Sequence, residues 1–278
     1  QQAPHLWGLL FIKRLVDLEM IKHVIPLMFL IGLSYSQGGG YALDFDGSND
    51  YVNISSVTNV STQMSFFAWA KLTNSSDTYR YILNSGDWTS GGRVYTGFQT
   101  SSRYVVDVHG AVPLESLVAL NYSLNMSDHL NAWHFYGFTI DTPSKTIVLY
   151  IDGVAVKSRT LTTFPSSLNL NAYLGAWFQS GEARGWIGNI DEVSLWNDVR
   201  TVAEIAANMH KVLDGDESNL VAYYKMSNGS GTSLTDNSSN SYTGTLTNMD
   251  NNDWITSQAP IGDLNSSYET DVEAIWKV

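Results

Sequence analysis

The sequence predicts an all-β protein, built as an antiparallel sandwich of two sheets with one short helix. Three observations support this fold class. Many short stretches rich in β-branched and aromatic residues are bounded by turn-forming residues, which favours strands. These stretches follow one another without the alternation of strands and helices that is typical of a parallel sheet. Only residues 201–209 have the apolar spacing of a convincing helix.

Length and composition narrow the function classes. The chain has 278 residues, enough for one large β domain, and we interpret it as one domain with tails. Its formal net charge is -12 with 15 Lys and Arg residues, so it lacks the concentrated basic surface that nucleic acid requires. It contains no cysteine, which excludes disulfides and thiolate metal sites, so a bound metal would use oxygen or imidazole ligands.

The N-terminal region carries a targeting signal. From Met20 the chain has a basic start, an apolar run from Val24 to Leu33 and then small and polar residues, which is the pattern of a secretory signal peptide. The apolar run has about half of the roughly 20 residues that a membrane span needs, so an anchor is the weaker interpretation. We expect a non-native upstream segment at 1–19 and a signal peptide at 20–36. The mature protein is then secreted and has no membrane span, and its lack of cysteine is typical of bacteria.

Residues 41–54 are predicted as two short strands around a tight turn. Gly47 permits a positive φ in this turn. Asp46, Asn49 and Asp50 place three side-chain oxygen donors within five residues. Such a set contributes to a calcium shell, but it also stabilises a turn through its own hydrogen bonds. The residues alone leave both interpretations open.

The next stretches are predicted strands. Residues 64–72 are hydrophobic on both faces and predict a central strand, covered on each side. Three further strands follow at 79–84, 92–99 and 103–109. The loop between the first two of these presents Trp88, a candidate exposed aromatic residue. Residues 110–131 lose the strand pattern, and whether this long connection is functional or disordered stays open.

A set of consecutive hairpins comes next. Residues 132–140 and 145–153 form the best hairpin pair in the chain, joined by a turn of typical composition. Asp152-Gly153 is a strong hairpin turn that leads into residues 154–160. Three successive antiparallel strands are therefore expected, and a further strand is predicted at 171–178.

The stretch 185–197, GWIGNIDEVSLWN, is predicted as the central strand around which the domain is organised. Side-chain alternation places Asp191 in line with the core and Glu192 on the opposite face. The core-facing set is Ile187, Asp191, Val193 and Leu195, and the opposite set is Glu192, Ser194 and Trp196. A buried carboxylate is costly without a partner, so Asp191 is expected to meet a cation, backbone N–H groups or a hydroxyl.

The remaining segments complete the predicted sandwich. Asp198 and Thr201 can cap the helix at 201–209, which is expected to plug one end of the sandwich. Residues 220–226 are a strong predicted strand and 244–249 a weaker one. The domain is expected to span 37–257, and 258–278 is expected to be a linker or the start of an incomplete following segment.

Four motifs identify a family resemblance. They are FDGSNDYV, YIDGV, GNIDEVSLWNDVRTVAEIAAN and NLVAYYKMSNGSGTSLTDNSSNSYTGTL. In this order, over about residues 41–257, the chain resembles the laminin-G-like domains of the concanavalin A-like lectin/glucanase superfamily. The resemblance implies a jelly-roll sandwich of two curved sheets. It also implies a structural calcium ion at a sheet edge and metal roles for Asp46, Asn49, Asp50 and Asp191.

The resemblance does not predict an enzyme. Laminarinase-type glucanases of this superfamily carry catalytic carboxylates at alternate positions of one strand, in a pattern like E-x-D-x-x-E, and this chain lacks it. Asp191 and Glu192 are adjacent, so alternation excludes them as that pair unless a bulge intervenes. No nucleophile elbow, zinc-protease helix or phosphate loop is present either. His109 and His134 are interpreted as sheet residues rather than ligands.

Three functions are compatible with these observations. The favoured one is a secreted, calcium-stabilised binding module for polysaccharides or surface glycoproteins, acting in adhesion or as an accessory domain of a larger extracellular protein. A structural spacer without its own ligand is the alternative, and a polysaccharide hydrolase or lyase is a weaker one. The sequence leaves the ligand and the oligomeric state open. The candidate ligand-binding residues are Trp88, Arg93, Tyr95, Trp177 and Arg184.

Overall fold

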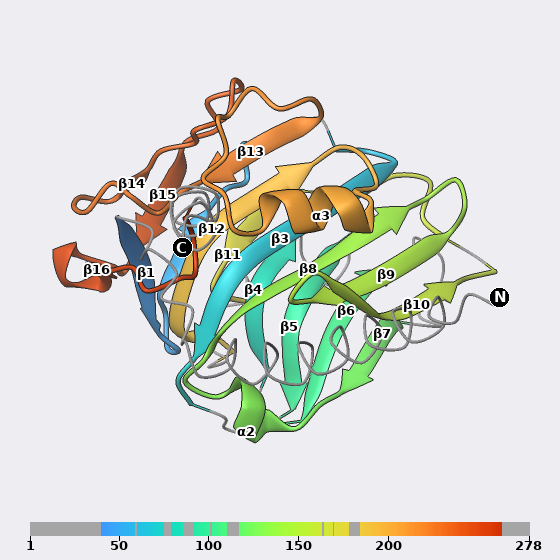
Figure 1. The fold of residues 1–278 in the computed structure, drawn as a ribbon, viewed down its shortest axis with the longest axis horizontal. Coiled ribbons are helices and arrows are strands. Elements are labelled where there is room, and N and C mark those ends of the chain that lie inside the picture. The colour runs from blue at the N-terminus through green and yellow to red at the C-terminus, as the bar shows by residue number, and fades with distance from the viewer. Residues whose placement is uncertain are drawn as a thin grey trace, which may run out of the picture. The chain divides into compact units, whose positions relative to one another are not determined.

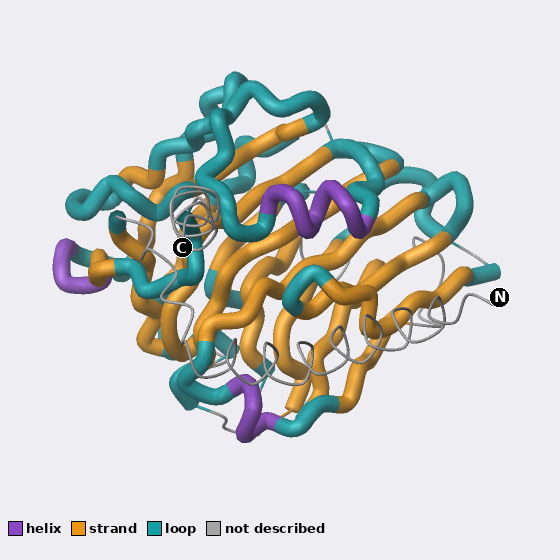
Figure 2. Tube along the Cα trace, in the orientation of Figure 1, coloured by secondary structure: helices purple, strands orange, loops and turns teal. Residues whose placement is uncertain are grey.

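The structure is a computed structural model in which two antiparallel sheets of eight strands each face one another (Figure 1). It describes residues 40–58, 60–74, 79–85, 92–100, 102–109, 117–162, 164–168, 170–177 and 184–262. The predicted upstream segment, the predicted signal peptide and Trp88 lie outside these residues. In the described part strands dominate and helices are few, which confirms the predicted all-β sandwich (Figure 2).

The first sheet contains the predicted central strands. Its order is β10-β9-β8-β3-β12-β1-β16, with β13 paired to β12. The three consecutive antiparallel strands β8, β9 and β10 are confirmed. The central position of β12, between β3 and β1, is confirmed as well. Its strands are β1 (Tyr41–Asp46), β3 (Gln63–Leu72), β8 (Trp133–Asp141), β9 (Thr146–Ile151), β10 (Val154–Thr160), β12 (Ile187–Trp196), β13 (Leu220–Tyr224) and β16 (Trp254–Thr256).

The second sheet contains two strands that the sequence pattern does not predict, β7 (Leu117–Ser123) and β14 (Ser233–Leu234). Its order is β14-β15-β2-β11-β4-β5-β6-β7. Within the stretch 110–131, β7 pairs with β6 along its whole length, from Arg103 opposite Ser123 to His109 opposite Leu117. The strands are β2 (Tyr51–Asn53), β4 (Arg80–Ser85), β5 (Val94–Thr100), β6 (Arg103–His109), β7 (Leu117–Ser123), β11 (Ala172–Leu174), β14 (Ser233–Leu234) and β15 (Gly244–Thr247).

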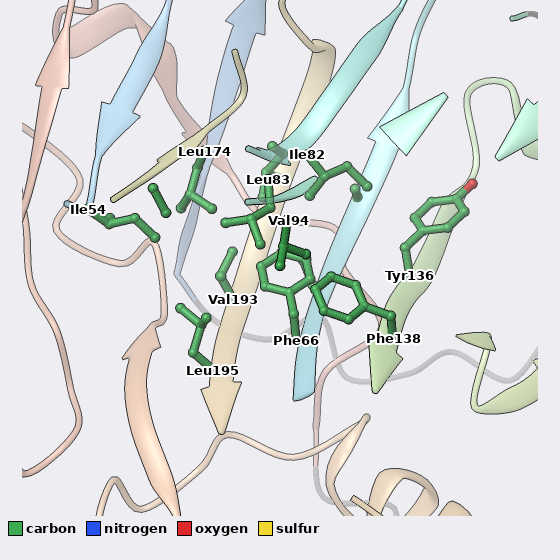
Figure 3. Packing of buried hydrophobic residues seen from close by; sticks show 14 of the residues in the cluster. Ile54, Phe66, Ile82, Leu83, Val94, Tyr136, Phe138, Leu174, Val193 and Leu195 are labelled. Carbon is green, nitrogen blue, oxygen red and sulfur yellow. The ribbon is translucent and has the colours of Figure 1, made fainter. Parts of the chain in front are cut away.

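The hydrophobic core lies between the two sheets. Phe66, Phe138 and Leu195 of the first sheet point toward Leu83 and Val94 of the second, and all five side chains are buried (Figure 3). At one position the second sheet requires glycine. A Cβ atom at Gly97 in β5, where φ is +155°, would lie 2.0 Å from the carbonyl oxygen of Arg80 in β4. The close approach of these two strands therefore excludes a larger residue.

A β-bulge in β12 overturns the predicted facing of Asp191. The register runs from Asp191 opposite Trp69 to Ser194 opposite Phe67, so two residues of β12 face a single residue of β3. Glu192 lies in the bulge with a φ of 50°. The extra residue places Asp191, like Trp69, on the outer face of the first sheet. The prediction that Asp191 lies in line with the core is therefore wrong, because strict alternation fails at a bulge.

Helix α3 (Val202–Asn208) covers a face of the sandwich rather than plugging its end. Thr201 caps it, and the Thr201 Oγ1 atom and the Glu204 side chain form reciprocal hydrogen bonds with each other's backbone N–H groups. The side chain of Ile205 packs with Phe67 and Trp69 on the outer face of the first sheet (Figure 1). The predicted end position is wrong because these two aromatic residues supply an apolar outer face for the helix.

Two smaller helical turns complete the described residues. α2 (Met126–His129) follows β7, and the 3-10 helix η1 (Asn251–Asp253) precedes β16, so the sequence underestimated the helical content. Beyond residue 257, Ala259 and Ile261 are buried in the cluster that contains Ile205. Within the described ranges, none of the helices combines the length and the hydrophobicity that crossing a membrane would require.

Candidate functional site

A row of aligned residues crosses the second sheet at right angles to its strands. Pairwise register places Thr245 opposite Asn53, Asn53 opposite Tyr173, Tyr173 opposite Asn84, Asn84 opposite Tyr95 and Tyr95 opposite Asp107. Residues directly opposite one another in a ladder share a face. Their strand neighbours, among them Val52, Leu83, Val94 and Val106, belong to the core. The transverse row, as we name these six residues, therefore lies on the outer face of the second sheet.

An aromatic cluster lies on the same outer face. Tyr81, Tyr95 and Val105 are buried together, and Tyr79 and Trp177 pack against them. The ring centroids of Tyr81 and Trp177 are 5.0 Å apart, and those of Tyr81 and Tyr95 are 5.2 Å apart in an edge-to-face arrangement. Tyr79 and Trp177 are half-buried and form the more accessible part of the cluster.

Two arginines stack on this aromatic cluster. The Arg93 guanidinium lies 4.6 Å from the Trp177 ring centroid and 5.1 Å from that of Tyr95. The Arg184 guanidinium lies 4.6 Å from the Tyr79 centroid and 5.4 Å from that of Trp177. All four distances are within the range of cation–π interactions. Four of the five predicted ligand-binding residues thus meet in one place, and the fifth, Trp88, lies outside the described residues.

Polar groups are buried beside the aromatic cluster. Burial raises the pKa of the Asp107 carboxyl, while the nearby Tyr95 hydroxyl and the charges of Arg93 and His109 lower it again in part. The Tyr95 hydroxyl is close enough to affect this pKa, yet neither oxygen of Asp107 accepts a hydrogen bond of good geometry within the described residues. The amide group of Asn84 likewise has no hydrogen-bond partner among them.

Sequence reasoning missed several members of this face. Tyr79, Tyr81 and Asn84 belong to the predicted strand 79–84, and Asp107 to the predicted strand 103–109. The available signal was a polar side chain at a strand position whose neighbours are apolar, as in Val-Val-Asp-Val-His around Asp107. His109 and His134 lie in β6 and β8, which confirms that both are sheet residues.

The first turn holds the three predicted metal ligands Asp46, Asn49 and Asp50 close together. The Asp46 N–H donates to Asp50 Oδ2 at 2.9 Å, and the Ser48 N–H donates to Asp46 Oδ1 at 2.7 Å. Burial raises the pKa of Asp50 to about 6, and the charges of Asp46 and Asp253 raise it further. The turn therefore makes its own hydrogen bonds, yet it keeps a concentration of negative charge.

Asp191, the fourth predicted metal ligand, does not join this turn. Asp46 pairs with Ile187, four residues before Asp191 in β12, which corresponds to about 13 Å along the strand. Asp191 accepts hydrogen bonds from the Ser257 hydroxyl and, at 2.8 Å, from the Glu192 N–H. In the described ranges no group of three His, Cys, Asp or Glu residues could hold a metal ion. The four residues therefore do not fit one calcium site, and calcium at the first turn stays a prediction.

Glu192 and Asp191 both lie on the outer face of the first sheet, so alternation no longer separates them. Glu192 accepts a hydrogen bond from the Tyr223 hydroxyl, and burial raises its pKa to about 7. Burial, together with the charge of Glu192, also raises the pKa of Asp191. Asp191 and Glu192 lie on the first sheet, whereas the aromatic cluster lies on the second.

A pocket beside α3 has Glu192 in its wall. It encloses about 380 Å³, including solvent at its mouth, and Phe67, Trp196 and Arg200 also line it. Three of the charged groups in its wall have partners, because Arg200 Nη1 lies 3.2 Å from Asp198 and 3.3 Å from Glu204, and Glu192 accepts from the Tyr223 hydroxyl.

Two antiparallel sheets face one another, and the second has polar and aromatic side chains on its outer face. This arrangement is a lectin-like β-sandwich. Residues 46–206 match the Laminin_G_3 family of the concanavalin A-like lectin/glucanases superfamily, and the chain belongs to this family. The family resemblance of the sequence is thereby confirmed. No curated protein shows a significant sequence match to the chain.

Solved structures share the fold at low sequence identity. A proposed carbohydrate-binding protein from Bacteroides ovatus is 19% identical, with a TM-score of 0.58 over 81% of this chain and 62% of its own. The CBM40 module of the Ruminococcus gnavus IT-sialidase, bound to α2,6-sialyllactose, is 15% identical, with a TM-score of 0.50 over 60% of this chain and 95% of its own. The chain thus spans about three fifths of the Bacteroides ovatus chain.

Proposed function

We propose that the chain is a secreted glycan-binding module whose binding surface is the outer face of the second sheet. The observation that carries this proposal is the convergence of Tyr81, Tyr95 and Trp177 with the guanidinium groups of Arg93 and Arg184. Aromatic rings pack against the apolar faces of sugars, and guanidinium groups donate hydrogen bonds to their oxygens. The half-buried residues Tyr79, Trp177 and Arg184 supply both kinds of contact, and the buried Tyr81, Tyr95 and Arg93 pack against them.

The fold similarities are consistent with this proposal. One of the two solved structures is described as a carbohydrate-binding protein, and the other holds a bound sialyllactose. At 15–19% identity they support the fold rather than a particular sugar. We propose that the partner is a polysaccharide or a surface glycoprotein. The role is then adhesion, or that of an accessory domain in a larger extracellular protein.

The proposed activity is binding rather than cleavage. The adjacent carboxyl groups of Asp191 and Glu192 lie on the outer face of the first sheet, where Ser257 and Tyr223 already donate hydrogen bonds to them. We therefore expect no release of reducing ends or unsaturated products from common polysaccharides. Reproducible release by the purified chain would overturn this part of the proposal.

A glycan array followed by isothermal titration calorimetry tests the binding function. Trp177→Ala should weaken binding of the best glycan at least about tenfold, because it removes the ring under both guanidinium groups. Trp133→Ala is the matched control, since Trp133 is also half-buried but lies in β8 of the first sheet. If no glycan binds the folded wild-type protein, the spacer function replaces this one.

Secretion is tested separately from binding. The proposal expects that export removes the predicted signal peptide and leaves a mature chain beginning near Gln37. Expression from Met20 in a bacterium, with N-terminal sequencing of the protein in the periplasm or medium, checks this. Retention of the uncleaved chain inside the cell would contradict it.

A further inference from the structure

The pocket beside α3 is built on aligned side chains of the first sheet. Ser194 of β12 lies directly opposite Phe67 of β3 on one side and Tyr223 of β13 on the other. Residues opposite one another share a face, so Ser194 lies between two aromatic residues on the outer face. All three line the pocket, and α3, which lies over β3, forms one of its walls (Figure 1).

Two polar atoms of the pocket lack a partner within the described residues. Ser194 is only 6% exposed, yet its hydroxyl makes no hydrogen bond there. Glu192 accepts from the Tyr223 hydroxyl through Oε2, whereas its Oε1 atom accepts no hydrogen bond. Neither atom is among the polar atoms that are sealed from solvent, so both can be reached from the pocket. The pocket therefore offers a ligand one carboxylate oxygen and one hydroxyl.

The backbone at Glu192 is strained at the point where this side chain enters the pocket. Glu192 lies in the β12 bulge with a φ of 50°. A left-handed conformation is unfavourable for a residue with a Cβ atom, and strain of this kind is found mainly at functional sites. A glycine would relieve the strain but would remove the carboxylate from the pocket.

The Glu192 carboxyl has no cation paired with it among the described residues. Burial raises its pKa to about 7, and the Tyr223 hydroxyl and the charge of Lys225 lower it again in part. No ion pair joins Lys225 to Glu192 within the described ranges. The charge of Glu192 in turn raises the pKa of the neighbouring Asp191. A cation bound in the pocket would therefore relieve two carboxyl groups at once.

The other charged groups of the pocket do not supply this cation. Arg200 pairs with Asp198 and Glu204 at 3.2 and 3.3 Å. Lys211 is exposed to solvent, and neither its charge nor that of Arg200 is among those that shift the pKa of Glu192. The positive charge beside the Glu192 carboxylate must therefore come from a ligand.

The lining of the pocket defines the chemical class of that ligand. An ammonium group has three donors and no acceptor, which matches a carboxylate oxygen and a hydroxyl oxygen. Aromatic faces such as those of Phe67 and Tyr223 attract cations as well. Much of the remaining lining is apolar and suits methylene groups better than the hydroxyls of a sugar ring. These apolar residues are Phe135, Ile205, Leu213 and Ile261.

We infer that the pocket beside α3 is a second binding site, which takes the ammonium group of a linear alkylamine through Glu192 and Ser194. A free aliphatic amine and the end of a lysine side chain carry this same group. The inference does not rest on the proposed function, because the pocket lies on the first sheet and the aromatic cluster on the second.

An NMR titration with n-butylammonium chloride at pH 8 tests the inference. The wild-type protein should bind this probe, and Glu192→Gln should weaken binding at least about tenfold because it removes the negative charge. Ser194→Ala should weaken it by a smaller factor of about three, because one hydrogen bond is lost. At pH 5 Glu192 is protonated, so the wild-type affinity should fall at least about tenfold. The amine stays charged at both pH values, with a pKa of about 10.4 as in lysine.

Further probes identify the ligand within its class. Binding of n-butylammonium without binding of Nα-acetyl-lysinamide assigns the site to free amines, and comparable binding of both extends it to lysine side chains. Equal affinity for n-butanol would overturn the inference, because the charge would then not be recognised. Tighter binding of glucosamine would overturn it as well, because the pocket would then prefer a sugar ring.

Control variants separate this site from the proposed glycan surface. Asp216→Asn removes one negative charge at an exposed position outside the pocket and should bind n-butylammonium like the wild type. Trp177→Ala on the second sheet should also bind it like the wild type. Thermal melting checks that each variant folds, and the pH comparison on the wild type needs no variant. No binding to the folded wild type at pH 8, or unchanged binding by Glu192→Gln, would overturn the inference and leave the proposed function untouched.

Discussion

Asp191 on the outer face of the first sheet and Asp107 on that of the second are both buried carboxyl groups, and burial raises the pKa of each. Asp191 accepts hydrogen bonds from Ser257 and from the Glu192 N–H. Asp107 instead has the Tyr95 hydroxyl and the charges of Arg93 and His109 beside it, and these lower its pKa in part. The fold thus accommodates the two buried carboxyl groups by different means.

The same contrast extends over both faces. On the first sheet the chain covers its own aromatic residues, because Ile205 of α3 and Ile261 pack on Phe67 and Trp69. On the second sheet the aromatic cluster contains no residue of the described helices. Its buried members are Tyr81 and Tyr95, and Tyr79 and Trp177 form its more accessible part.

The largest expected effect is on the free energy of unfolding, and it is measured by a tryptophan-to-alanine substitution on each face. Trp69 is 3% exposed, its ring lies tilted against that of Phe135 at a centroid distance of 5.4 Å, and its Nε1 donates to the Met209 carbonyl at 2.7 Å. Trp69→Ala should therefore lower the free energy of unfolding by about 3–5 kcal/mol. Trp177→Ala, at a half-buried site, should cost about 1–2 kcal/mol and act mainly on binding. Urea denaturation of both variants measures the difference, and equal losses would mean that the second cluster is structural.

The next largest effect is a pH dependence of the free energy of unfolding, which arises from the titration of Glu192. Its pKa rises from an ordinary 4.5 to about 7 because of burial, so the folded state favours the protonated form. The raised pKa therefore adds about 3 kcal/mol to the free energy of unfolding below pH 4.5. This contribution is lost as the pH rises to about 7. Glu192→Gln should remove most of this decrease.

Denaturation at pH 5 and pH 8 measures the effect of Glu192. Tyr223→Phe provides the complementary variant, because it removes the hydroxyl that donates to Glu192 and lowers its pKa. In that variant the loss of stability should extend to higher pH. If the free energy of unfolding of the wild type does not decrease from pH 5 to pH 8, the Glu192 carboxyl is ionised in the folded protein without cost.

A smaller effect compares a satisfied polar group with an unsatisfied one. Ser257→Ala removes the hydroxyl that donates to the buried Asp191, and should cost about 1–3 kcal/mol of stability. Asn84→Leu removes an amide without a described partner, and should leave stability unchanged or raise it by about 1 kcal/mol. Thermal melting in the absence of sugar compares the two. A large destabilisation by Asn84→Leu would erase the difference between the faces.

The sequence predicts the strands better than it predicts their local irregularities. Residues 64–72 read correctly as a central strand, because hydrophobic residues on both faces indicate burial on both faces, and the strand predicted at 185–197 is central as well. The bulge at Glu192 was not predictable, because a single left-handed residue leaves no trace in the apolar pattern. That one residue decides the facing of Asp191.

The candidate site was predictable in its chemistry but not in its register. Arg93, Tyr95, Trp177 and Arg184 were identified as residue types suited to sugars, and they do meet on one face. The transverse row could not be predicted, because it joins residues as distant in sequence as Asn53 and Tyr173. Pairing between distant strands depends on the whole sheet, and alternation within a strand does not specify it.

The smallest expected effect tests a polar group that belongs to neither face. The first turn joins β1 of the first sheet to β2 of the second, and its Asp50 carboxyl is buried with a pKa raised to about 6. The predicted calcium ion would relieve this charge, so a tenfold excess of calcium over its dissociation constant should add about 1.4 kcal/mol of stability. A chelator should lower the melting temperature, and Asp50→Asn should remove that sensitivity, whereas Asp191→Ala should not. A melting temperature that chelator leaves unchanged would mean that hydrogen bonds within the turn suffice.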